Sequence, residues 1–62
     1  MSDILTQIQC VKREIALRKS VYPGLVARGK MKQATANYEL EGMMEVLATL
    51  ERVKHSVLNE NL

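Results

Sequence analysis

Few side chains in this sequence are of the types that carry out chemistry. A catalytic nucleophile needs a base within hydrogen-bond reach and a third group that orients the base. Cys10 and His55 form the one nucleophile–base pair of this kind, and they could meet if the chain folds back on itself as a helical hairpin. A lone helical cysteine is more often a small apolar filler, and a lone histidine near a helix C-terminus is more often a solvated partner of the helix dipole. We therefore expect no enzyme activity and no catalytic residue.

Metal and cofactor sites are not indicated either. Structural zinc needs four closely spaced ligands, whereas the chain offers one histidine, one cysteine and scattered glutamates. Gly24 and Gly29 flank the segment LVAR, but the lysine–threonine pair of a phosphate-binding loop does not follow. We expect no metal and no cofactor.

Length and composition indicate one small helical domain over residues 1–62. Hydrophobic residues make up 47% of the chain but include no Phe or Trp, so the core must be aliphatic. A single cysteine cannot form an intrachain disulfide and fits a reducing compartment. No apolar run reaches the roughly 18 residues of a membrane span, and the N-terminus lacks the basic and apolar regions of a signal peptide. We expect a cytoplasmic protein that makes no membrane contact.

The hydrophobic spacing predicts a first helix over about residues 3–21, with Ser2 as its N-cap. Apolar residues recur at the spacing of one helical face at Ile4, Ile8, Val11 and Ile15. Pro23 disfavours helical geometry at the residue before it, so the helix is expected to end near residue 21. The same proline is suited to open a short helical turn over about 23–28, which a left-handed Gly29 would close.

A second helix is predicted over about residues 33–57, followed by a frayed tail at 59–62. Its apolar residues cover about 180° of its surface, whereas an ordinary surface helix needs a stripe of about 100°. The first helix likewise carries a second apolar line, at Cys10, Leu17 and Val21. Gly42 lies inside the second helix at a cost near 1 kcal/mol relative to Ala, and its position opposite the main stripe offers no obvious reason for it.

These features predict an all-α fold, a helical hairpin of two long helices with a short helical turn at the corner. A lone hairpin of this length has a thin core, and its surplus apolar stripes remain uncovered. Pairing of two hairpins into a four-helix arrangement would cover them, so we expect a homodimer. The residues we assign to self-association are Val46, Leu50, Val53 and Val57. A heptad seam of the coiled-coil type also runs along the second helix.

The charge is sorted along the chain. Residues 12–32 carry a net charge of +6, whereas residues 33–62 carry −3. Arg28, Lys30 and Lys32 cluster at the corner, whose outline resembles a helix-turn-helix. The helix after the corner carries Glu39, Glu41 and Glu45, which repel phosphate and argue against insertion into a DNA groove. The alternatives are a basic corner that binds nucleic acid and a solvated corner that complements acidic residues of the same fold.

The segments VYPGLVARGKM and ANYELEGMMEVLATLERV resemble a group of small uncharacterised proteins encoded by tailed bacteriophages and prophages. The matching residues lie within about 12–53 and are Val21, Tyr22, Pro23, Val26, Gly29, Lys30, Met31, Ala36, Glu39, Leu40, Met43, Val46 and Leu50. The resemblance implies a setting, the cytoplasm of an infected bacterium, and no particular activity. Lys32 departs from the family pattern, which tends to place Thr or a similar N-cap there, so the second helix is expected to start less firmly.

Taken together, the sequence favours a non-enzymatic phage or prophage accessory protein that acts by binding another host or phage protein. The residues we assign to partner binding are Arg28, Lys30, Tyr38, Glu41 and Glu45. One alternative is a dimeric nucleic-acid-binding regulator that uses the basic corner. Another is a structural subunit of a larger phage assembly, for which higher-order association is expected.

Overall fold

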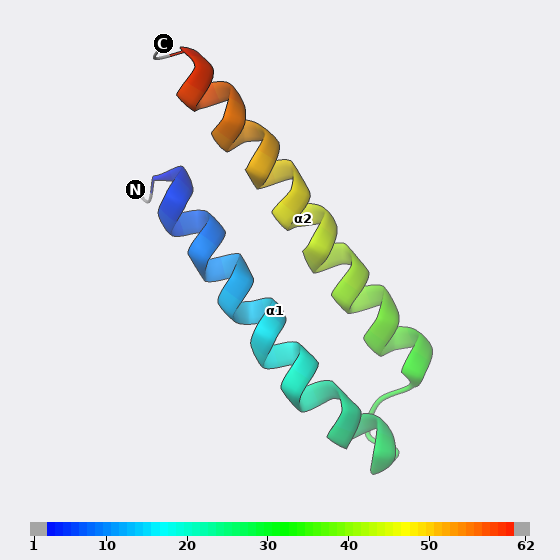
Figure 1. Ribbon diagram of the computed structural model, residues 1–62. Helices are drawn as coiled ribbons and strands as arrows, with labels where there is room; N and C mark the ends of the chain where they lie inside the picture. Colours follow the sequence, from blue (N-terminus) through cyan, green and yellow to red (C-terminus); the bar gives the residue numbers. More distant parts are fainter. Residues whose placement is uncertain (1–2, 61–62) are drawn as a thin grey trace.

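Two helices lie side by side and antiparallel in the computed structural model, which describes the backbone of residues 3–60 and the side chains of residues 3–58 (Figure 1). Helix α1 spans Ile4–Ala27 and helix α2 spans Gln33–Glu60. The described residues contain no strand, so the predicted all-α helical hairpin is confirmed. The molecule is elongated, with extents of 50 × 18 × 16 Å.

Helix α1 starts at a side-chain cap. The Asp3 carboxylate accepts a hydrogen bond from the backbone N–H of Thr6 at 2.8 Å, which satisfies one of the unpaired donors of the first turn. The backbone hydrogen bond from Thr6 also holds the pKa of the Asp3 carboxyl below its ordinary value, because it favours the charged form. The predicted cap at Ser2 lies outside the described residues, and Asp3 is the N-cap.

The predicted end of the first helix near residue 21 is wrong. Helix α1 continues through Pro23 to Ala27, so residues 23–27 form its final turns instead of a separate helical turn. A proline inside a helix removes one N–H and crowds the carbonyl four residues earlier, here that of Lys19. The cost is tolerated in α1 because the turn after the proline is held by half-buried Leu25 and by a tightly bonded C-terminus.

The C-terminus of α1 is closed by a Schellman motif around Gly29. This glycine has a positive φ of 71°, as predicted for the residue that closes the turn. Its N–H donates to the carbonyl of Val26 at 3.0 Å, and the N–H of Lys30 donates to the carbonyl of Leu25 at 2.8 Å. These two bonds satisfy carbonyls that would otherwise be unpaired at the helix end, and they turn the chain toward α2.

Helix α2 begins directly after Lys32, whose carbonyl accepts from the N–H of Ala36 at 3.0 Å. Lysine has no acceptor for the free N–H groups of the first turn. The helix continues to Glu60, beyond the predicted end at residue 57. Of the predicted frayed tail, residues 61–62 lie outside the described part of the chain.

The core between the helices is thin and aliphatic. Among the described side chains only Ile8, Ile15 and Ala36 are buried, with exposed fractions of 3%, 8% and 2%. Around them lies a seam of half-buried residues, Ile4, Val11, Leu40, Met43, Leu47 and Leu50. An ion pair from Lys12 Nζ to Glu51 Oε1 at 3.9 Å links the two helices, and its exposure limits its contribution to stability to at most about 1 kcal/mol. No described helix combines the length and the apolarity that a membrane crossing requires.

Candidate interaction surfaces

The hairpin leaves much of its apolar surface in solvent. Among the side chains of residues 3–58, nine large hydrophobic ones are exposed, namely Leu5, Leu17, Val21, Tyr38, Met44, Val46, Val53, Val57 and Leu58. Three of the four residues assigned to self-association are among them, and the fourth, Leu50, is half-buried. The self-association surface itself stays a prediction, but its valines are accessible to a partner.

The exposed apolar residues are not spread evenly around the hairpin. The Lys12–Glu51 ion pair marks one long side of it. At about 100° per residue, Cys10, Leu17 and Val21 lie on the opposite side of α1 from Lys12. On α2, Val46 and Val53 lie on the side away from Glu51 by the same spacing. Leu17, nine residues from buried Ile8, is also opposite the core, so the second apolar line of α1 faces outward. We call the lateral surface of α2 formed by Val46 and Val53 the valine face.

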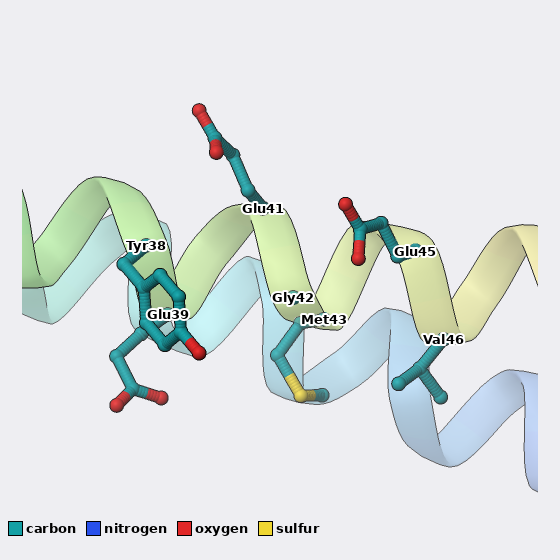
Figure 2. A pocket seen from close by; sticks show the side chains of 7 residues that line it. All are labelled: Tyr38, Glu39, Glu41, Gly42, Met43, Glu45 and Val46. Carbon is teal, nitrogen blue, oxygen red and sulfur yellow. The ribbon is translucent and has the colours of Figure 1, made fainter.

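A shallow hollow opens on α2 at Gly42 (Figure 2). It has a volume of about 320 Å³, and its lining residues are Tyr38, Glu39, Glu41, Gly42, Met43, Glu45 and Val46. A neighbouring hollow of about 340 Å³ shares Gly42, Glu45 and Val46 and extends the depression to Thr49 and Leu50. A Cβ built on Gly42 would meet no atom within 4 Å, so Gly42 faces open space on this surface.

Three of the predicted partner-binding residues come together around this hollow. Glu41 and Glu45 project from one side of α2, whereas Met43 and Val46 point to the other (Figure 2). Tyr38 lies one turn before Gly42 and is 76% exposed, as expected for a ring on the polar face. An exposed aromatic ring and carboxylates on the same stretch of α2 offer both apolar contact and negative charge to a partner.

The remaining two predicted partner-binding residues, Arg28 and Lys30, lie at the corner between the helices and line neither hollow. Together with Lys32 they are exposed. The Arg28 guanidinium folds back along the last turn of α1 and lies over Gly24. A Cβ built on Gly24 would be 3.6 Å from Arg28 Nη1. The corner is therefore a separate positively charged surface.

The structure does not assemble the pair that could have been catalytic. Cys10 is exposed, and its sulfur lies 3.6 Å from Arg13 Nη2 of the same helix. By helical spacing, Cys10 lies on the side of α1 away from Lys12, whereas His55 lies on the side marked by the Lys12–Glu51 ion pair. Within the described residues, no three His, Cys, Asp or Glu side chains are grouped closely enough to hold a metal ion.

Gly42 is the one surface feature that sequence reasoning missed. Gly42 lies opposite the apolar stripe of α2 that packs on α1, and it has no packing role in that stripe. Its spacing from Val46 and Val53, four and eleven residues along the chain, would have placed it beside the surplus apolar line.

Comparisons with known proteins do not place the chain in a family. No protein-family model matches it, and neither the curated proteins nor the solved structures contain a significant match.

Proposed function

We propose that this chain is a non-enzymatic interaction protein that works by binding other proteins, first a second copy of itself and then a host or phage protein. The observation that carries the proposal is the imbalance between buried and exposed apolar side chains. The described hairpin buries three hydrophobic residues and exposes nine large ones. Monomeric soluble proteins rarely expose large contiguous apolar patches unless these are interaction sites.

Apolar and charged parts of the surface have different roles in this proposal. The apolar residues Val46, Leu50, Val53 and Val57 serve self-association. The foreign partner meets Tyr38, Glu41 and Glu45 around the Gly42 hollow, or Arg28 and Lys30 at the corner. Complementary charges at such surfaces set the rate of encounter and the choice of partner more than the affinity. The acidic surface around Gly42 and the basic corner together suit a partner that carries both positive and negative charge.

The proposed setting is the cytoplasm of a phage-infected or prophage-carrying bacterium. It is supported by the resemblance of the Val21-Tyr22-Pro23 segment and its downstream Gly29-Lys30-Met31 to the phage and prophage proteins described above.

A capture experiment with matched variants tests the foreign-partner surface. A photo-crosslinking amino acid at position 38 is used to trap partners from a bacterial lysate, with and without Glu41→Arg and Glu45→Arg. We expect trapped proteins whose yield falls at least tenfold on the double reversal and is unchanged by Lys19→Glu, a charge reversal on α1. Identical trapped proteins in all three samples would refute the assignment of this surface.

A second candidate function is nucleic-acid binding at the corner, favoured by the exposure of Arg28, Lys30 and Lys32 on one short connection. Three phosphate contacts give a slope of about −2.7 in log affinity against log salt, or a loss of about 40-fold between 50 and 200 mM salt. Titration of mixed-sequence duplex DNA by fluorescence anisotropy measures this slope. The absence of binding at 50 mM salt would eliminate the candidate.

A further inference from the structure

Helix α2 carries a second coiled-coil seam that α1 does not cover. Its first seam, which includes half-buried Leu40, Met43 and Leu47, packs on α1. About 100° around the helix from this first seam, exposed residues recur at alternating intervals of four and three residues, the spacing at which one helix meets a partner helix. This second seam runs from Thr35 to Ser56, over most of α2, and it includes the valine face.

The second seam consists of two lines of side chains that differ in size. Small residues form one line, Thr35, Gly42, Thr49 and Ser56, and larger residues form the other, Glu39, Val46 and Val53. The two hollows on α2 open along the small line, at Gly42 and at Thr49, and Figure 2 shows Val46 beside Gly42. In an antiparallel pair of such helices each layer of the interface combines one larger and one small side chain, so the layers have similar volumes. A parallel pair would alternate crowded layers with empty ones.

We infer that a second copy of this chain docks on the second seam, with the two α2 helices antiparallel. In the inferred register Val46 meets Thr49 of the second copy and Val53 meets Gly42, and the two-fold symmetry forms each contact twice. This inference rests on the self-association in the proposed function. It adds the surface, the direction and the register of the pairing.

Charged side chains at the edge of the second seam select this register. Glu45 and Arg52 lie on the same edge, beside the small line, and neither forms an ion pair within residues 3–58. Arg52 Nη2 donates to Thr49 Oγ1 at 3.3 Å, so the guanidinium lies next to the seam. In the inferred register Glu45 of each copy lies within about 3 Å along the axis of Arg52 of the other. Two contacts between opposite charges therefore form across the interface.

The other ways of joining the same lines bring like charges together. A shift by one heptad in one direction places Glu45 beside Glu45 of the second copy, and a shift in the other direction places Arg52 beside Arg52. In a parallel pair every seam residue meets its own counterpart, so Glu39 would lie against Glu39. Because juxtaposed like charges suppress a wrong pairing, the antiparallel register with Val46 against Thr49 is favoured.

The hairpin has enough uncovered surface for this contact. A folded monomer of 7.0 kDa is expected to expose about 4000 Å², whereas this hairpin exposes 4903 Å². The difference of about 900 Å² is close to the roughly 800 Å² that each partner buries in a standard protein interface. Leu50 and Val57, the other two residues assigned to self-association, flank the larger line and add apolar area to the contact.

Light scattering across a concentration series tests whether the chain pairs through the second seam. Val46 and Met44 have the same exposed fraction, 47%, but Met44 lies on the opposite side of α2, so Met44→Glu is the matched control for Val46→Glu. We expect wild type and Met44→Glu to have twice the chain mass of 7.0 kDa, whereas Val46→Glu is monomeric. A dimer that only Met44→Glu dissociates would overturn the inference. Circular dichroism confirms that each variant stays helical.

Disulfide cross-linking in a Cys10→Ser background tests the direction and the register. Copper-phenanthroline oxidation of Gly42→Cys, of Val53→Cys and of the double variant is followed on non-reducing gels. We expect only the double variant to double its mass, because each position 53 meets position 42 of the other copy. Identical positions of the two copies are about 16 Å apart along the axis, as are positions 42 and 53 within one chain, which is too far for a disulfide. Cross-linking of Val53→Cys alone would mean a parallel pair and would refute the inference.

A charge exchange tests the contact between Glu45 and Arg52. Glu45→Arg alone and Arg52→Glu alone each place like charges together twice, so we expect each to raise the dimer dissociation constant at least fivefold. The double variant exchanges the charges and should return the constant to within about threefold of wild type. Glu41→Arg makes the same change of charge outside the seam and should leave it unchanged. A double variant as weak as the single ones would show that the register is wrong.

The outcomes separate this inference from the proposed function on which it rests. A monomeric wild type would refute both the inference and the proposed self-association. A dimeric wild type whose double cysteine variant does not cross-link would refute the inference and leave self-association standing on another surface. None of these measurements involves a foreign protein, so their failure is distinct from a failure of the capture experiment.

Discussion

Replacement of Pro23 by alanine tests whether α1 is one continuous helix. In the structure Pro23 lies inside α1 with helical residues on both sides, so Pro23→Ala restores an N–H that can donate to the carbonyl of Lys19. Proline is about 3 kcal/mol less favourable than alanine in a helix interior. It also restricts the unfolded chain, a benefit of about 0.4–1 kcal/mol that the variant loses. The side chain of Pro23 is exposed, so little packing is removed.

The net expectation is a gain of about 2 kcal/mol in the free energy of unfolding, or about 10 °C in the melting temperature of a domain of this size. Thermal unfolding followed by far-UV circular dichroism measures it. Gly24→Ala is the control, because Gly24 is helical whether or not the helix breaks before Pro23, and its gain of about 1 kcal/mol shows that the assay responds. A gain for Gly24→Ala with none for Pro23→Ala would refute the continuous helix, since proline is favourable at the first position of a new turn.

Two further expectations concern the core and the cap. Ile8→Ala should lower the free energy of unfolding by about 2–4 kcal/mol because Ile8 is buried, whereas Leu5→Ala, at a 56% exposed position of the same helix, should change it by at most about 0.5 kcal/mol in urea titrations. The lowered pKa of Asp3 means that its contribution is present above the ordinary carboxyl pKa and is lost as the pH falls through the lowered value. In Asp3→Asn, which keeps a capping oxygen without a titratable proton, that part of the pH dependence of the melting temperature should disappear. If wild type and Asp3→Asn show the same acid profile, the ionised form of the Asp3 carboxyl does not contribute to stability.

The periodic features of the hairpin could be predicted from the sequence. Ile8 and Ile15 repeat at the spacing of one helical face, and they are the buried residues of α1. Gly29 could be predicted as the left-handed residue because a chain that reverses between two helices needs a C-terminal cap there. In both cases a single local rule, helical spacing or C-terminal capping, determines the structure, and no tertiary contact opposes it.

The extent of α1 could not be predicted in this way, because two effects compete at Pro23. The local preference of the residue before proline argues for a helix end. The packing of half-buried Leu25 and the bonds around Gly29 argue for another helical turn, and both depend on where α2 lies. A preference of one residue is a weak prior when tertiary contacts oppose it. The hollow at Gly42 could not be predicted because it depends on how the side chains around it on α2 are arranged in space, which the spacing of one apolar stripe does not describe.

Pro23 and Gly42 both lower the stability of the helices that contain them, and the thin core of a single hairpin offers little to offset this. Relative to alanine they cost about 4 kcal/mol of helix stability, which is as much as the roughly 3–5 kcal/mol that the core of a chain this short supplies. The described hairpin buries only three side chains. Pro23 lies in the turn that leads into the corner, whereas a Cβ at Gly42 would meet nothing within the chain. Gly42 therefore weakens its own helix, and no packing contact inside the hairpin offsets that cost.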